Sequence, residues 1–245
     1  MTPSAAIRST LAARARELAG PSLTTKVRCL VRGYGLPRWG NLRRTTPFSA
    51  TYGFDRGTPI DRYYLNQFLN LHRDRISGAV LEVQTDGYTE RFGAGVTRAD
   101  TFDIVPLFDP TYLCDFAHCD AAIPSRAYDC LLLPNTLPHL RELDRALAQA
   151  ARVVRPGGTI LASAAGLLPL TRDVPEYWRL SPDGWRERLS SAWPGAAIDV
   201  AGHGNCLASV AAQLGLAVEE LTAAELDVQD PRYPVLITVL CRLPQ

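Results

Sequence analysis

The chain of 245 residues lacks the features that mark several classes of protein. It has no run of about 18 apolar residues, so we expect no transmembrane helix. The net charge is only +1, so no strong electrostatic field favours nucleic acid or a membrane surface. No apolar core followed by a small-residue cleavage site stands near the N-terminus, so we expect no signal peptide and a cytoplasmic location. Internal repeats and low-complexity tracts are also absent.

Cysteine is present, but not in patterns typical of metal or redox sites. None of the six cysteines forms a Cys-x-x-Cys pair. Cys114 and Cys119 flank His118, but the spacing fits no common zinc pattern, so we expect no metal site. Cys130 and Cys241 lie in apolar runs, where a free thiol behaves as a small hydrophobic side chain. We therefore expect reduced thiols, as in a cytoplasmic protein.

Short apolar runs alternate with amphipathic segments along most of the chain. We expect strands at 79–83, 96–105, 111–114, 128–133, 159–164, 198–201 and 235–241. We expect helices at 60–76, 88–92, 139–154, 181–192 and 205–214, with a capping box at 222–225. This alternation predicts an α/β fold with a mostly parallel sheet and helices on both faces. Residues 1–20 predict an amphipathic helix. The predicted division is therefore an N-terminal helical arm and loop over 1–57, followed by one domain over 58–245.

Two local patterns make sharper predictions. In Thr58-Pro59-Ile60-Asp61, Thr58 is expected to cap a helix, with Pro59 at its first position and Asp61 completing a capping box. Arg155-Pro156-Gly157-Gly158 is expected to form a sharp turn between a helix and the next strand.

Polar residues stand at or near the ends of the predicted strands. The stretch Ala79-Val80-Leu81-Glu82-Val83-Gln84-Thr85-Asp86-Gly87 is an apolar run that ends in an acid and passes into a turn. Asp100 and Asp115 belong to the second and third strands, and Asn135 follows the fourth. In open α/β sheets, ligands bind at the carboxyl ends of the strands, so these residues are candidates for a binding site.

The stretch around Glu82 resembles the first motif of class I S-adenosylmethionine-dependent methyltransferases. Residues 128–137 resemble the fourth-strand motif of that family, and residues 153–162 resemble its segment with Arg-Pro-Gly-Gly before the fifth strand. Residues 53–64 resemble a segment of methyltransferase-like proteins from bacterial sugar and natural-product gene clusters. The resemblance spans about residues 47–240 and implies a Rossmann-like class I methyltransferase fold with a seven-stranded sheet.

The same resemblance implies cofactor contacts, with one departure. If S-adenosylmethionine is used, Glu82 and Gln84 lie in the first motif, Asp100 is the ribose acid and Asp115 contacts the adenine amine. However, Gln84 stands where the family has its first glycine. Glycine has no Cβ and adopts a positive φ freely. Gln84 would project into the cofactor's space or force the loop outward, so our first expectation is that no cofactor is used.

The first functional hypothesis is therefore an enzyme that has kept the scaffold and does not use the cofactor. Asp115 and Glu176 would hold a substrate ammonium and take its proton, freeing an amine as the nucleophile. Arg179 or Arg56 would hold an anionic leaving group. Glu176 has a second interpretation, as a partner of Arg172 or Arg179 on a solvated loop.

A narrower resemblance gives this hypothesis a reaction. The chain is similar to the methyltransferase-like subunit of aziridine-forming enzymes in azinomycin-type biosynthesis, where an amine displaces a sulfate ester within one molecule. The resemblance implies a small-molecule substrate and a small partner protein. Asn135 and Tyr63 are the further residues expected to contact the substrate.

Two alternatives remain open. One is an S-adenosylmethionine-dependent O- or N-methyltransferase acting on a sugar or natural product, with an acid or His139 near Asn135 as a candidate base. The other is a non-catalytic methyltransferase-like subunit that stabilises a partner and docks through residues 1–20. Binding of S-adenosylmethionine separates the methyltransferase from the other two hypotheses.

Overall fold

The structure is a computed structural model that describes residues 23, 25–32, 40–172 and 174–245. The chain divides into two units, Met1–Thr45 and Thr46–Gln245. In the first unit, Gly40–Leu42 form a short 3-10 helix, η1. The helix predicted over 1–20 lies outside the described residues. No helix in the described part of the chain is long and apolar enough to cross a membrane.

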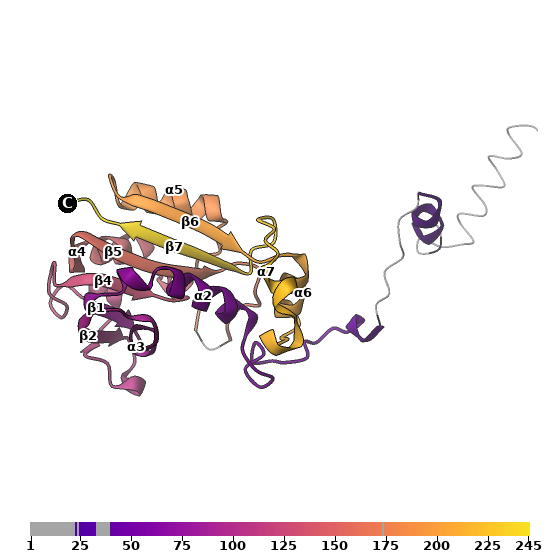
Figure 1. Ribbon diagram of the computed structural model, residues 1–245, viewed down its shortest axis with the longest axis horizontal. Helices are drawn as coiled ribbons and strands as arrows, with labels where there is room; N and C mark the ends of the chain where they lie inside the picture. The colour runs from indigo at the N-terminus through magenta and orange to yellow at the C-terminus, as the bar shows by residue number, and fades with distance from the viewer. Residues whose placement is uncertain (1–22, 24, 33–39, 173) are drawn as a thin grey trace, which may run out of the picture. The chain divides into compact units, whose positions relative to one another are not determined.

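The second unit is built on one sheet of seven strands in the order β3-β2-β1-β4-β5-β7-β6 (Figure 1). The strands are β1 (Gly78–Val83), β2 (Val96–Asp103), β3 (Tyr112–Leu113), β4 (Tyr128–Leu133), β5 (Val154–Ala165), β6 (Ala197–His203) and β7 (Leu236–Arg242). Strands β1 to β5 are parallel, and β7 runs antiparallel to both β5 and β6. The mostly parallel sheet predicted from the sequence is confirmed.

Helices cover both faces of this sheet (Figure 1). The α-helices are α2 (Ile60–Leu71), α3 (Gly87–Phe92), α4 (Leu143–Val153), α5 (Pro182–Ala192), α6 (Cys206–Gln213) and α7 (Ala223–Asp227). The 3-10 helices are η2 (Arg73–Arg75), η3 (Pro106–Phe108), η4 (Phe116–His118), η5 (Leu137–His139) and η6 (Val218–Glu220). One apolar core joins α4 and α5 to the sheet, and a second joins α2, α3, α6 and α7 to the opposite face.

The position of strand β4 inside the sheet explains why its sequence is apolar at almost every position. Leu131 and Leu133 pack into the core under α4 and α5, whereas Cys130 and Leu132 pack under α2. All four side chains are fully buried. A parallel strand covered on both faces has no solvent side, so polar alternation is not expected there.

The predicted capping box at the start of α2 is wrong. Pro59 occupies the N-cap position, and no side chain caps the helix there. The backbone N–H and the hydroxyl of Thr58 instead donate to the Glu219 carboxylate, at 2.9 and 2.8 Å. Asp61 accepts a hydrogen bond from Asn135 Nδ2 at 2.8 Å. Thr58 and Asp61, which the local pattern assigns to the cap, are therefore bonded to residues far away in the sequence.

The predicted sharp turn at residues 155–158 is also wrong, because these residues belong to strand β5. Gly157 N–H donates to Pro244 O at 2.9 Å, and Leu243 N–H donates to Gly158 O at 3.0 Å. The C-terminal residues thus extend the ladder alongside this segment. The register against β4 shifts here, and Gly157 has a φ of 73°, as in a β-bulge that contains glycine.

Candidate functional site

The carboxyl ends of the parallel strands meet at one edge of the sheet, and four polar residues lie there. Gln84 follows β1, Asp103 ends β2, Asp115 follows β3 and Asn135 follows β4. Backbone bonds hold neighbouring ends together, because Gln84 N–H donates to Phe102 O at 2.8 Å. We call this region the carboxyl edge, and it is where a ligand is expected in an open α/β sheet.

Glu82 lies inside the protein beneath the turn that follows β1. The residue is 1% exposed. Its carboxylate accepts the backbone N–H of Tyr88 at 3.1 Å, and the backbone N–H and hydroxyl of Thr89 at 2.8 and 2.7 Å. Burial raises the pKa of Glu82 to about 7, although these hydrogen bonds oppose the shift. The predicted cofactor contact thus uses its oxygen atoms to close the turn and to fix the start of α3.

Gln84 adopts the left-handed conformation that glycine favours, with a φ of 71°. Its side chain is exposed. The loop is therefore not forced into another backbone conformation, and the glutamine side chain stands on a glycine-like turn. A residue with a Cβ in this conformation costs about 1–3 kcal/mol. Asn135 is also left-handed, with a φ of 50°, which asparagine tolerates better than most residues.

The acid at the end of β2 is Asp103, whereas the sequence predicts Asp100 as the ribose acid. Asp100 lies within the strand opposite Leu81 and accepts the Tyr128 hydroxyl at 2.6 Å. Asp103 Oδ1 accepts the N–H groups of the next two residues, at 2.6 and 3.2 Å. The sequence pattern extends the predicted strand to residue 105, beyond its observed end, and so places Asp103 inside it.

Asp115 is exposed at the carboxyl edge, directly after β3. Its Oδ1 accepts the Ala117 N–H at 3.0 Å and so caps the short helix η4. A capped, exposed carboxylate is held in one orientation and remains accessible to a cationic ligand.

Glu176 is paired with Arg179, but the pair is not on a solvated surface, since the Glu176 side chain is only 3% exposed. Its Oε1 accepts the Thr171 N–H at 2.8 Å, and its Oε2 accepts Arg179 Nε–H at 2.6 Å. Burial opposes ionisation of this carboxyl, but the hydrogen bonds from Arg179 and Thr171 outweigh it and lower its pKa. Glu176 is therefore a buried, ionised carboxylate.

The two arginines predicted to hold an anionic leaving group are engaged within the chain. Arg179 donates to Glu176 and to three backbone carbonyls in residues 166–169, at 2.7 to 3.2 Å. Arg56 forms a two-point ion pair with Glu220 through Nε, at 2.9 Å, and Nη2. Each guanidinium thus has its planar fork occupied by partners that belong to the fold.

Tyr63 and His139 also contact groups within the chain. The Tyr63 hydroxyl donates to Asp227 of α7 at 2.7 Å. His139 Nδ1 lies 3.0 Å from Pro175 O, in the segment that contains Glu176. Neither contact joins these side chains to Asn135.

A buried polar network holds Asn135. Its Nδ2 donates to Asp61 Oδ2 at 2.8 Å, and its Oδ1 accepts the Ser163 hydroxyl at 3.1 Å. Arg62 Nη1 contacts the same Asp61 oxygen at 3.3 Å. Asp61 is 8% exposed and Ser163 is fully buried. Sequence reasoning missed Asp61, Arg62 and Ser163, and no local pattern signals them, because the network joins α2 to the ends of β4 and β5.

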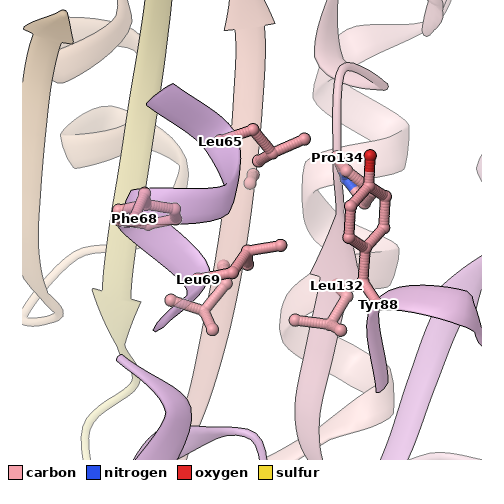
Figure 2. A pocket seen from close by; sticks show the side chains of 8 residues that line it. Leu65, Phe68, Leu69, Tyr88, Leu132 and Pro134 are labelled. Carbon is pink, nitrogen blue, oxygen red and sulfur yellow. The ribbon is translucent and has the colours of Figure 1, made fainter. Parts of the chain in front are cut away.

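A narrow apolar pocket includes Pro134, the residue before Asn135, in its lining (Figure 2). It is lined by Leu65, Phe68, Leu69, Tyr88, Leu132, Pro134, Leu161 and Ala162. No water-sized sphere fits inside it. The side chains that line this pocket therefore fill it almost completely.

Within the part of the chain that the structure describes, no three His, Cys, Asp or Glu side chains gather into a group that could hold a metal ion. Cys119 and His118, which the sequence places close together, contact different partners. The Cys119 thiol lies 3.5 Å from Gln149 Oε1 and from Arg152 Nη2. His118 Nε2 lies 2.8 Å from Glu142 Oε1.

Comparison with known proteins places the fold. A family model described as a methyltransferase domain matches residues 96–162. The complex between the Haloferax volcanii Trm112 methyltransferase activator and a methyltransferase contains a similar chain. That chain is 16% identical, with 81% of this chain and 96% of that chain covered and a TM-score of 0.53. An S-adenosylmethionine-dependent methyltransferase from Listeria monocytogenes is 10% identical, with 76% and 97% covered and a TM-score of 0.50.

No curated protein matches the chain at the level of sequence. At these identities the structural likeness establishes the fold. The protein has the class I methyltransferase fold, Rossmann-like, with a mostly parallel seven-stranded sheet, as predicted from its sequence blocks.

This fold family implies S-adenosylmethionine, and the residues of the β1 turn test that implication. A glycine turn admits the cofactor because no side chain stands on it. Here the backbone conformation is kept, but Gln84 places an exposed side chain on the turn. These residues do not fit the cofactor in the way that a glycine turn does.

The strain at Gln84 predicts a stability change. Gln84→Gly should raise the free energy of unfolding by about 1 kcal/mol, because glycine adopts this φ without a Cβ clash. Thr85→Gly is the matched control, and it should lower that free energy because it only adds freedom to the unfolded chain. Denaturant titration of both variants measures the two values. A loss of stability in Gln84→Gly equal to that of the control would contradict a left-handed Gln84.

The burial of Glu82 predicts a pH dependence. The folded protein binds the Glu82 proton more tightly than the unfolded chain does, since the pKa rises from 4.5 to about 7. The contribution to stability is therefore complete below the lower value and is lost as the pH rises to the higher one, a fall of about 3 kcal/mol. Glu82→Gln should remove this fall, and Glu90→Gln, on the exposed side of α3, should keep it. Free energies of unfolding at about pH 5 and about pH 8 provide the test.

Proposed function

We propose that this protein is an enzyme of natural-product biosynthesis that uses a class I methyltransferase scaffold without S-adenosylmethionine. In the proposed reaction an amine displaces an anionic leaving group, such as sulfate, within one small molecule and closes an aziridine-type ring. The observation that carries the proposal is Gln84, which puts a side chain on the turn where cofactor binding requires its absence. The scaffold otherwise keeps polar groups at its carboxyl edge, and function depends on such groups and not on the fold.

Asp115 is the proposed catalytic base. Its exposed carboxylate binds the substrate ammonium and accepts one proton, which frees the nitrogen lone pair. That lone pair forms the new C–N bond while the C–O bond to sulfate breaks, and the bonding electrons leave with the sulfate oxygen. The ring nitrogen keeps one positive charge until a second proton passes to solvent. Holding the amine and the carbon in line supplies much of the rate of such a closure.

Glu176 is the second carboxylate in the proposal. Its hydrogen bonds with Arg179 and Thr171 keep it ionised, and a substrate ammonium would have to share its oxygens with these two donors. The segment that carries it packs on η5, the 3-10 helix that follows β4, because Tyr177 N–H donates to Pro138 O at 2.7 Å. That contact supports a place for Glu176 near the carboxyl edge.

A small partner protein is part of the proposal. The support is the similar chain in a complex with the Trm112 methyltransferase activator. The resemblance to the aziridine-forming subunit implies a partner as well.

A methyltransferase is the second candidate function, and the same turn favours it. Gln84 keeps the left-handed φ and the hydrogen bond to Phe102 O that align a glycine turn. In that case Asp103, at the end of β2, is the acid placed to meet a ribose. Calorimetric titration with S-adenosylmethionine and S-adenosylhomocysteine decides between the two candidates. We expect no heat of binding at millimolar ligand, and micromolar binding would sink the proposed function.

Removal of the Asp115 charge predicts a loss of ring closure. Asp115→Asn should lower kcat by about 100-fold or more, because the amide cannot accept the proton. The thermal midpoint should stay unchanged, because the amide oxygen of the variant can still accept the N–H of Ala117. Release of sulfate from an amine that carries an internal sulfate ester measures the rate. Asp74→Asn, an exposed acid in η2, is the matched control, and equal rates in the two variants would remove Asp115 from the mechanism.

A further inference from the structure

Arg62 lies in the first turn of α2, and its position connects it to the carboxyl edge. Its Nη1 lies 3.3 Å from Asp61 Oδ2, and Asn135 Nδ2 lies 2.8 Å from the same oxygen. Two N–H donors, one from α2 and one from the end of β4, thus converge on a single carboxylate atom. Asp61 is 8% exposed, so the residue that holds both donors is buried.

The Arg62 guanidinium is less committed than those of Arg56 and Arg179. Arg179 and Arg56 use their planar forks on partners within the fold. Arg62 makes one long contact through Nη1, and its other N–H groups have no partner among the described residues. Its side chain is 29% exposed and so reaches solvent from a partly buried position.

The charges of Arg62 and Asp61 both act on the Tyr88 phenol. Burial raises the pKa of Tyr88, the positive charge of Arg62 lowers it and the negative charge of Asp61 raises it. Both charges therefore lie near the phenol that lines the apolar pocket with Pro134, the residue before Asn135 (Figure 2). Arg62 and the Asn135 amide contact the same Asp61 oxygen, which brings both donors together beside the end of β4.

We propose that Arg62 and the Asn135 amide form an oxyanion subsite that binds the sulfate group of the substrate. The assignment rests on the proposed function. A guanidinium fork matches two oxygens of a tetrahedral oxyanion, and the Asn135 amide offers a second Nδ2–H beside it. Asp61 and Ser163 act as positioning residues, because they fix the amide through both of its ends.

The subsite has a role in the ring closure itself. The sulfate group carries one negative charge as an ester and two once the C–O bond has broken, and the bonding pair goes to its oxygen. A fixed positive charge next to it therefore stabilises the transition state more than the bound ester. The Asp61 carboxylate opposes an incoming anion, but its Oδ2 is already shared by two donors, and the 3.3 Å contact to Arg62 is readily exchanged for an oxyanion.

Binding of inorganic sulfate tests the subsite without any substrate. In ¹⁵N-labelled protein we expect the Asn135 side-chain amide signals to shift when sulfate replaces chloride at constant ionic strength. Arg62→Ala should abolish the shift, and Arg73→Ala, an exposed arginine just beyond α2, should preserve it. The absence of a shift in the wild-type protein, or the same shift in Arg62→Ala, overturns the assignment.

Kinetics on the sulfate ester separate this inference from the function on which it rests. We expect Arg62→Ala to lower kcat by about 100-fold, as for loss of one preorganised donor. Arg62→Lys should recover only part of the rate, because lysine keeps the charge and loses the fork. If the wild type closes the ring and Arg62→Ala is equally fast, the subsite fails and the function stands. If sulfate shifts Asn135 but the wild type closes no ring, the function fails and the anion site stands.

Discussion

The buried carboxylate of Glu82 is the constraint on which the carboxyl edge depends. By accepting the N–H groups of Tyr88 and Thr89, it ties the end of β1 to the first turn of α3. The residues between them must then close in a tight turn, and Gln84 takes a left-handed φ within it. An unpaired carboxylate at this depth would be costly, so the hydrogen bonds and the turn stabilise each other. The same bonds set the position of Tyr88, which lines the closed apolar pocket.

Three arginines show why residue type alone does not identify a site. Arg56 and Arg62 lie within residues 53–64, which resemble a segment of methyltransferase-like proteins, and Arg179 lies in the loop after β5. Arg56 is matched by Glu220, which stands 164 positions away, and Arg179 holds the backbone of its own loop. Of these three, Arg62 combines a partly buried place at the edge with open donors. Partners far apart in sequence decide which guanidinium is available to bind a ligand, and the residues next to each arginine do not predict those partners.

The same distinction separates what the sequence predicts from what it does not. Strand β4 follows from its local apolar run, and the capping box at Thr222 forms because its partner Glu225 lies one turn away. The box at Thr58 fails because Glu219 competes for it. For the candidate site, the edge itself is predictable from strand–helix alternation. The network of Asp61 and Ser163 is not, because it assembles from the start of α2 and the ends of β4 and β5.

The strand order gives the proposed reaction its geometry. Among the four neighbouring strands β3, β2, β1 and β4, Asp115 follows β3 at one side and Asn135 follows β4 at the other. Gln84 follows β1 and so lies between them. At about 4.8 Å per strand, the two outer ends are roughly 14 Å apart. An aspartate side chain on one side, an arginine side chain on the other, and a short substrate hydrogen-bonded to both would together span such a distance. Displacement at carbon needs the nucleophile and the leaving group on opposite sides of that atom. The proposed cation site at Asp115 and the proposed anion site at Arg62 would flank the β1 turn and so meet this need, and the proposed reaction requires no cofactor at that turn.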